Sequence, residues 1–299
     1  MKHHEVAVIG AGPAGIACTI QLSRYGIMPL LFERDIPGGL LKNANLVENY
    51  PGFPGGIKGT KLIEKMTRQL DMVNVPVIHE NVIIVNYKED LFRIKTDQNT
   101  YISQKLVIAS GTVPAEWTEF AIPETIRYKI FYEVYPLREL RDSVIVIIGA
   151  GDAAFDYAIQ LAVNNKVMIM NRTEDLKCLP LLWQRAKANP RISYYENHVL
   201  RQVTEVPSSS QLKLLFQTKN EMASFLADYV IFATGRRPEL SFCDPELLNH
   251  LDELQQDGKL YLAGDVKNDL FRQASIAAGD GIRAAMEIYF NESNKKNKE

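Results

Sequence analysis

Two glycine-rich segments of this chain have the residue types and spacing that bind a dinucleotide pyrophosphate. They are Gly10-Ala11-Gly12-Pro13-Ala14-Gly15 and Gly149-Ala150-Gly151-Asp152-Ala153-Ala154. Each follows a short apolar, β-branched run and precedes a segment of helical character, the context in which a G-x-G-x-x-G/A motif is meaningful. The first glycine makes the tight turn, the second lets the backbone approach the pyrophosphate, and the third lets helix and strand pack closely. Two such loops predict two bound dinucleotides, and a protein that holds two dinucleotides usually moves electrons between them.

An acidic residue supports the first of these sites. Residues 6–34 read as strand, helix and strand, with Gly26 where the helix should stop. Glu33 ends the second strand, about 20 residues beyond the fingerprint. A carboxylate at that place accepts hydrogen bonds from a ribose hydroxyl and repels a 2′-phosphate.

The cysteines and histidines indicate no further chemistry. Cys18, Cys178 and Cys243 lie far apart in the sequence and form no C-x-x-C pair, so we expect neither a disulfide framework nor a zinc site. We interpret Cys18 as buried packing and prefer the same interpretation for Cys178 and Cys243, with a reactive thiol as the alternative. The five histidines show no paired-ligand spacing, so we expect no metal site.

The rest of the chain supplies the elements that must position these loops. Residues 37–60 are rich in Gly and Pro, which predicts a long, shaped loop of the kind that is often functional. Pro114 and Pro123 mark a hinge into a second half that repeats the first, and both halves finish in an Ala-Ser/Thr-Gly turn. This repeat predicts an α/β protein with two nucleotide-binding, Rossmann-like, three-layer domains. We expect helices at 59–73, 153–163, 179–188 and 273–288, and strands near 75–87, 91–95, 101–109, 166–170, 192–206, 211–218 and 259–265.

Composition limits the classes of partner. The chain has 299 residues, of which 46% are hydrophobic and 23% charged, and a formal net charge of −2. This charge gives no reason to expect a nucleic acid or an anionic membrane as partner, and no apolar run approaches the ~18 residues of a membrane span. The N-terminus enters a strand at once and leaves no room for a signal peptide, so we expect a cytoplasmic protein. We interpret the lysine-rich stretch 291–299 as a frayed tail.

Together these features resemble the low-molecular-weight thioredoxin reductase family of FAD- and NAD(P)H-binding flavoproteins, over nearly the whole chain. The resemblance implies a discontinuous FAD-binding domain, 1–113 and 240–299, interrupted by an NAD(P)-binding domain at 114–239. It also implies a homodimer. Besides the two fingerprints, the motifs that carry it are Gly38-Gly39, residues 47–52, residues 233–238, Ala263-Gly264-Asp265, Arg272-Gln273-Ala274 and Ala278-Gly279.

The resemblance implies residues for both nucleotides. Asp265 has a clear physical task there, because a carboxylate at a strand end accepts hydrogen bonds from ribityl hydroxyls. For FAD the implied residues are Gly10, Gly12, Pro13, Ala14, Gly15, Glu33, Gly39, Leu40, Asn49, Val82, Gly111, Asp265, Gln273 and Ala274. For NADP they are Gly149, Gly151, Asp152, Ala153, Ala154, Arg172, Lys177 and Gly235.

The second nucleotide site indicates NADPH, with NADH as the alternative. In NADPH-using relatives a basic cluster at the strand end grips the 2′-phosphate. Arg172 and Lys177 match that cluster in charge, while Thr173 departs from it. No carboxylate stands at the strand end itself to prefer an unphosphorylated ribose.

The sequence departs from the family at its redox centre. Thioredoxin reductases carry a redox-active C-x-x-C just before the second fingerprint, where this chain has Tyr132-Glu133-Val134-Tyr135. A tyrosine forms neither a thiolate nor a mixed disulfide, so direct reduction of thioredoxin by the family's mechanism is excluded. Tyr132 and Tyr135 either stack on the flavin or are ordinary packing. Leu40 replaces a glutamine that is common beside the flavin, and losing that amide changes the potential or reactivity of the ring.

We therefore predict a FAD-dependent NAD(P)H oxidoreductase without an internal disulfide, in which nicotinamide passes hydride to flavin and the reduced flavin reduces an external acceptor. Hydride transfer needs no general base, so we nominate no acid–base residue. Candidate acceptors are a small redox protein such as ferredoxin or flavodoxin, a disulfide, and a quinone. Two alternatives stay open: a non-catalytic flavoprotein that senses redox state or docks on a partner, and a flavoprotein reduced by ferredoxin.

Overall fold

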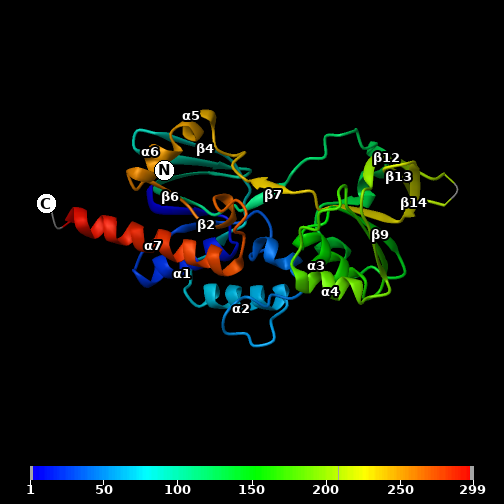
Figure 1. Cartoon of the computed structure of the whole chain (residues 1–299). Helices are drawn as coiled ribbons and strands as arrows, with labels where there is room; N and C mark the ends of the chain where they lie inside the picture. Colours follow the sequence, from blue (N-terminus) through cyan, green and yellow to red (C-terminus); the bar gives the residue numbers. More distant parts are fainter. Residues whose placement is uncertain (1–2, 208, 297–299) are drawn as a thin grey trace. The chain divides into compact units, whose positions relative to one another are not determined.

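The computed structural model describes residues 3–207 and 209–296, and the chain forms two compact units (Figure 1). The first unit comprises Met1–Lys42, Val47–Val113 and Arg237–Glu299. The second comprises Asn43–Leu46 and Pro114–Arg236. The short segment Asn43–Leu46 therefore belongs to the second unit, although the residues on both sides of it in sequence belong to the first.

The first unit is built on a seven-stranded sheet in the order β3-β2-β1-β6-β5-β4, with β17 also paired to β6. β1 lies between β2 and β6 and is parallel to both, while β4 and β5 form an antiparallel excursion from β6. The strands are β1 (His3–Ile9), β2 (Leu30–Phe32), β3 (Val77–Ile78), β4 (Val82–Lys88), β5 (Leu91–Thr96), β6 (Thr100–Ile108) and β17 (Leu260–Leu262).

Helices cover this sheet, and the last of them packs against the first. Figure 1 shows α7 in red lying along α1 in blue, and the two helices share one apolar core with β1. α1 ends as predicted near Gly26, where the N–H of Ile27 donates to the carbonyl of Leu22 at 3.0 Å. The helices are α1 (Pro13–Arg24), α2 (Gly59–Asp71), α5 (Pro245–Asn249), α6 (Leu251–Gln256) and α7 (Ala274–Lys296), with short 3-10 turns η1 (Gly39–Asn43) and η4 (Gly264–Val266).

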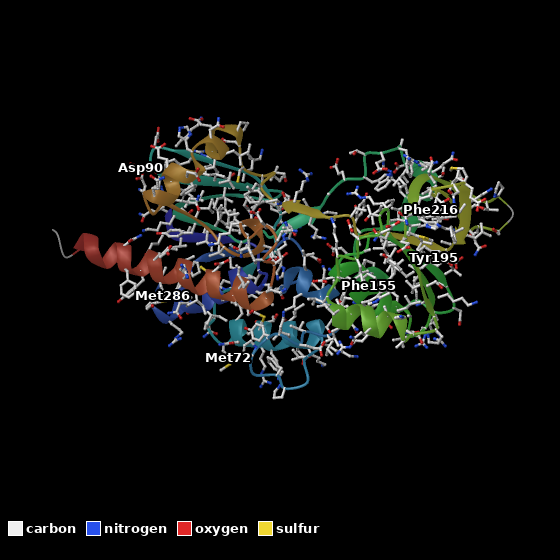
Figure 2. All side chains as sticks on the ribbon, viewed as in Figure 1. Met72, Asp90, Phe155, Tyr195, Phe216 and Met286 are labelled. Carbon is white, nitrogen blue, oxygen red and sulfur yellow. The ribbon has the colours of Figure 1, made fainter. Side chains whose placement is uncertain are left out.

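The second unit repeats the plan on a five-stranded parallel sheet, β11-β10-β9-β15-β8, and adds a three-stranded antiparallel sheet, β12-β13-β14. Phe155 of α3 and Phe216 of β13, labelled in Figure 2, are fully buried in its two cores. The elements are η2 (Glu124–Lys129), β8 (Ile130–Phe131), η3 (Tyr135–Leu137), β9 (Val144–Ile148), α3 (Asp152–Leu161), β10 (Lys166–Met170), α4 (Pro180–Lys187), β11 (Ile192–Tyr195), β12 (Val199–Glu205), β13 (Leu212–Gln217), β14 (Met222–Ala227) and β15 (Tyr229–Phe232). A separate two-stranded ladder joins β7 (Thr112–Pro114) and β16 (Arg236–Pro238).

The structure confirms the predicted α/β class and corrects two local expectations. β14 was not predicted, because only its register opposite β13 in a hairpin distinguishes Met222–Ala227 from a loop. The stretch 291–296 is helical and belongs to α7, whereas we expected a frayed tail. The remaining part of the expected tail, 297–299, lies outside the described residues.

In the part of the chain that the structure describes, no helix is both long enough and apolar enough to cross a membrane. Within the same residues, no three His, Cys, Asp or Glu side chains are grouped so that they could hold a metal ion.

Candidate functional site

The first glycine-rich loop closes tightly around the end of β1. The N–H of Gly10 donates to the carbonyl of Phe32 at 2.8 Å, and a Cβ on Gly10 would lie 2.5 Å from the carbonyl oxygen of Ala109. α1 begins at Pro13 and has no side-chain cap, so its first N–H groups are not used by a capping side chain. A Cβ on Gly12 would meet nothing within 4 Å. Open space at the positive end of a helix fits a pyrophosphate group.

Glu33 is fixed beside this loop by two backbone hydrogen bonds. Its carboxylate accepts from the N–H of Ala11 at 2.8 Å and from the N–H of Asp35 at 3.0 Å. Each carboxylate oxygen carries more than one lone pair, so both retain acceptor capacity. The arrangement places an oriented acceptor at the first loop, where the sequence predicts a ribose contact.

Other predicted FAD residues gather from distant parts of the sequence. A Cβ on Gly39 would lie 3.3 Å from the Cα of Gly12, and a Cβ on Gly264 would lie 2.9 Å from that of Ala14. Asp265 follows Gly264 in η4, at the end of β17. The structure therefore brings η1, η4 and the first loop together.

The remaining predicted FAD residues lie at element ends. The amide of Asn49 donates to the side-chain oxygen of Gln273 at 2.7 Å, which joins the Gly/Pro-rich loop to the start of α7. Leu40 lies in η1, Val82 begins β4 and Ala274 begins α7. The carbonyl of Gly111 accepts a hydrogen bond from the N–H of Glu239 at 3.0 Å.

The second glycine-rich loop repeats the geometry of the first. The N–H of Gly149 donates to the carbonyl of Met170 at 2.9 Å, and a Cβ on Gly149 would lie 2.3 Å from the carbonyl oxygen of Ala233. A Cβ on Gly151 would again meet nothing within 4 Å, and α3 begins at Asp152 with no side-chain cap. Gly235 ends the matching turn after β15, and its carbonyl accepts from the N–H of Ala115. This loop fits a second pyrophosphate for the same physical reason.

The residues after β10 are folded back onto this loop. Lys177 forms an isolated backbone bridge with Gly151, and the carboxylate of Asp152 accepts from the N–H of Leu179 at 2.7 Å. The amide of Asn171 donates to the carbonyl of Asp175 and to the hydroxyl of Tyr194, both at 3.0 Å.

This ordering was not predicted from the sequence. Asn171 shapes the turn that carries Arg172. Asp152 has its predicted place in the fingerprint, and its carboxylate also binds the backbone at Leu179. An asparagine at a strand end was the available signal, because its side chain commonly organises the turn that follows.

The segment 132–135 is fixed within the second unit. The ring of Tyr132 packs near that of Phe232, with centroids 5.8 Å apart. The side chain of Asn43 donates to Glu133 at 3.0 Å and accepts from the N–H of Tyr135 at 3.1 Å. These contacts are those expected if the tyrosines are packing residues, and stacking on a flavin stays a prediction.

The three cysteines are free, and burial raises the pKa of each thiol. The pKa of Cys18 rises to about 12 through burial, and that of Cys243 to about 12 through burial and the nearby Asp244. For Cys178 burial is again the largest cause, followed by the carboxylate of Asp152. A raised pKa leaves little thiolate at neutral pH, which favours the packing interpretation over reactive thiols.

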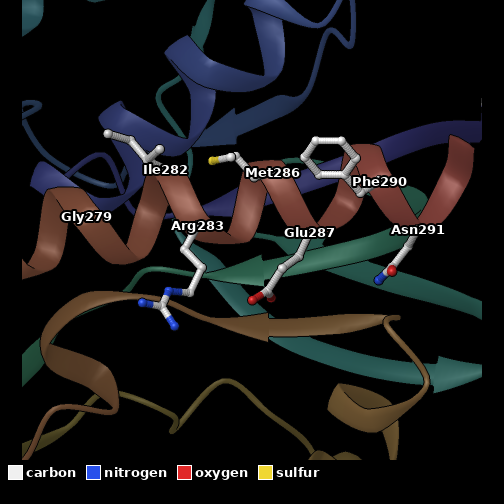
Figure 3. Close-up of a pocket in the computed structure, with 7 residues that line it drawn as sticks. All are labelled: Gly279, Ile282, Arg283, Met286, Glu287, Phe290 and Asn291. Atoms are coloured by element: carbon white, nitrogen blue, oxygen red, sulfur yellow. The ribbon is translucent and has the colours of Figure 1, made fainter.

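A pocket lies along α7 and is lined by Gly279, Ile282, Arg283, Met286, Glu287, Phe290 and Asn291 (Figure 3). Ile282, Met286 and Phe290 project from one side of the helix, and Arg283 and Glu287 from the other. The three apolar side chains are 39–52% exposed. We call this surface, Ile282 to Phe290 on α7, the α7 stripe.

Two Rossmann-like units with duplicated dinucleotide loops define a class of two-domain α/β oxidoreductases. The sequence profile of the family described as pyridine nucleotide-disulphide oxidoreductase matches residues 4–281, and the chain belongs to this family. Within it, the chain has the fold of low-molecular-weight thioredoxin reductases and lacks the cysteine pair.

The individual relatives agree with this assignment. Thioredoxin reductase 2 of Arabidopsis thaliana is 30% identical, over 96% of this chain and 82% of the relative. Thioredoxin reductase of Rickettsia typhi is 29% identical, over 95% of this chain and 96% of the relative. The crystal structure of Lactococcus lactis thioredoxin reductase gives a TM-score of 0.84 at 26% identity, covering 96% of this chain and 98% of that one. The bacillithiol disulfide reductase of Bacillus cereus, at 18% identity and a TM-score of 0.76, covers 97% of this chain and 100% of its own and shares the fold.

Proposed function

We propose that this protein is a FAD-dependent NAD(P)H oxidoreductase that passes electrons directly from its flavin to an external acceptor. The observation that carries this proposal is the combination of two similar dinucleotide loops with a sequence that contains no C-x-x-C pair. Family membership supports flavin and pyridine-nucleotide chemistry. The missing dithiol supports an acceptor outside the chain.

In this proposal the first unit binds FAD. The uncapped N–H groups of α1 hold the pyrophosphate, Glu33 holds a ribose, and Asp265 accepts hydrogen bonds from the ribityl chain. The Asn49–Gln273 hydrogen bond orders the two segments that meet the ring. When bound, FAD supplies the redox chemistry, since its ring takes two electrons from a nicotinamide and gives them up again.

The second unit binds NADPH in the same way, with the uncapped start of α3 at the pyrophosphate. Arg172 and Lys177 supply positive charge for a 2′-phosphate. Glu174 would oppose it, but its carboxylate is paired with Lys219 and accepts from Asn197. The hydrogen bond from Lys219 lowers the pKa of Glu174, as expected for a neutralised carboxylate.

The acceptor classes follow from the absence of an internal disulfide. A ferredoxin- or flavodoxin-like protein, a small disulfide and a quinone all take electrons from reduced flavin without a protein thiol. We test the proposal by mixing the purified protein with NADPH under anaerobic conditions, following flavin absorbance, and then adding each acceptor class in turn. The proposal expects bleaching by NADPH, reoxidation by at least one class, and no reduction of thioredoxin. Protein that holds flavin but is bleached by neither NADPH nor NADH would contradict it.

We also propose that the protein is a homodimer, joined through the α7 stripe. The stripe presents three exposed apolar side chains, and Arg283 and Glu287, which lie one helical turn apart, line the same pocket from the other side of the helix. An antiparallel crossing of two copies of α7 sets Arg283 of each copy opposite Glu287 of the other, so the surface is complementary to itself.

A further inference from the structure

One carboxylate on α7 holds the turn that carries Asp265. Asp280 accepts a hydrogen bond from the N–H of Gly264 at 3.2 Å and another from the side-chain amide of Asn268 at 2.6 Å. Its other oxygen lies 3.4 Å from the ammonium of Lys267. Gly264 precedes Asp265 and Asn268 follows it, so Asp280 fastens the turn on both sides of that residue.

The position of Asp280 is well defined. Its side chain is 16% exposed, and both of its oxygens have partners from the turn. Charge-assisted hydrogen bonds of this kind are stronger and more directional than neutral ones. The turn η4 is short and has no side-chain cap of its own, and Asp280 attaches it to α7.

Gly281, the residue after Asp280, fixes α7 against the first glycine-rich loop. A Cβ on Gly281 would lie 2.0 Å from the carbonyl oxygen of Ala14, and a Cβ on Gly264 would lie 2.9 Å from the Cβ of Ala14. The start of α1, the turn η4 and the Asp280-Gly281 pair therefore meet at Ala14. Because nothing larger than glycine fits at Gly281, α7 lies against α1 at one fixed depth.

We propose that Asp280 is a positioning residue for the flavin nucleotide. It sets the turn that carries Asp265 relative to the Gly10–Gly15 loop, so that both bind the same ligand. The inference rests on the proposed function, because it takes FAD as that ligand. Asp280 acts through Asp265 and through the backbone of η4, and needs no contact with FAD itself.

The test measures the dissociation constant of FAD with full-length protein stripped of flavin, by quenching of flavin fluorescence. Asp280→Ala removes all three contacts, and we expect the dissociation constant to rise at least about tenfold. Asp280→Asn keeps the shape but loses the charge, and we expect a smaller rise. Asp269→Asn is the matched control, since Asp269 is an exposed carboxylate on the same loop, and we expect no change.

A double-variant cycle separates positioning from a general effect on folding. If Asp280 acts through Asp265, then adding Asp280→Ala to Asp265→Ala weakens FAD binding little beyond the effect of Asp265→Ala alone. Full additivity of the two losses, or FAD binding by Asp280→Ala as tight as in the wild type, would overturn the inference. Wild-type protein that binds no FAD would instead contradict the proposed function, and the inference with it. Circular dichroism of the flavin-free variants confirms that they are folded.

Discussion

Asn43 donates a hydrogen bond to the carboxylate of Glu133 at 3.0 Å, and so ties a segment between two predicted flavin residues to the segment 132–135, where we expected the family's cysteine pair. The same side chain accepts from the N–H of Tyr135, and Asn43 is only 3% exposed. Glu133 also pairs with Arg236 at 3.2 Å. The segment 132–135 is therefore joined to the rest of the second unit by a small polar network.

We predict that Asn43→Ala destabilises the second unit by about 1–3 kcal/mol, because it removes two hydrogen bonds that a buried amide makes, one to the carboxylate of Glu133 and one from the N–H of Tyr135. Both tryptophans, Trp117 and Trp183, belong to this unit, so tryptophan fluorescence during urea unfolding follows it specifically. Asn45→Ala is the control, since Asn45 bonds to Asp156 through its backbone N–H, which the substitution keeps. Equal stability of the Asn43 and Asn45 variants would show that the network contributes nothing.

Arg172 should decide the choice of pyridine nucleotide. Charge reversal in Arg172→Glu is expected to weaken NADPH binding roughly 10- to 100-fold, the range of a lost charge-assisted hydrogen bond. NADH binding should change little, because NADH has no 2′-phosphate. Arg201→Glu, an exposed arginine on β12 of the same unit, controls for net charge. Titration calorimetry with both nucleotides makes the comparison, and an unchanged affinity for NADPH would remove Arg172 from the site.

The α7 stripe should set the oligomeric state. Met286→Asp places a charge in the apolar contact and is expected to give monomers, as measured by light scattering after size-exclusion chromatography. Met72→Asp is the matched control, because Met72, labelled with Met286 in Figure 2, is an exposed methionine of the same unit outside the stripe. Arg283→Glu should weaken the dimer, and Arg283→Glu combined with Glu287→Arg should restore it. A dimer that survives Met286→Asp would place the interface elsewhere.

Stability should fall at alkaline pH partly because of Cys18. Burial raises the pKa of this thiol from 9.0 to about 12 in the folded protein, so the unfolded chain releases its proton first. This contribution to the free energy of unfolding is fully present below pH 9 and is lost as the pH rises from 9 toward 12. Over that range the loss corresponds to one proton that the folded protein holds and the unfolded chain has released. Unfolding of wild type and Cys18→Ala, followed by circular dichroism across this range, should show the steeper loss in the wild type. Parallel curves would contradict the assignment.

The glycine-rich loops and Glu33 are features that the local sequence was sufficient to predict. The two fingerprints could be predicted from the sequence because only glycine fits at positions 10 and 149. At either position a Cβ would collide with a neighbouring carbonyl oxygen. Glu33 was predictable for a similar reason, since its spacing from the loop is fixed by one strand and one helix.

The missed residues depend on contacts between distant segments. Nothing near Asp280 in sequence indicates that it holds the turn at Gly264, and nothing near Asn43 indicates that it bonds to Glu133. β14 was missed for the same reason, because its pairing with β13 stabilises it.

The number of electrons that the purified protein takes up per flavin tests the central claim most directly. A flavin accepts two electrons, and a redox-active disulfide beside it would accept two more. Anaerobic titration with NADPH should therefore bleach the flavin completely with about one equivalent, after which further NADPH is not consumed. Uptake of a second equivalent before NADPH accumulates, or a preparation that contains no flavin and binds none, would contradict the account.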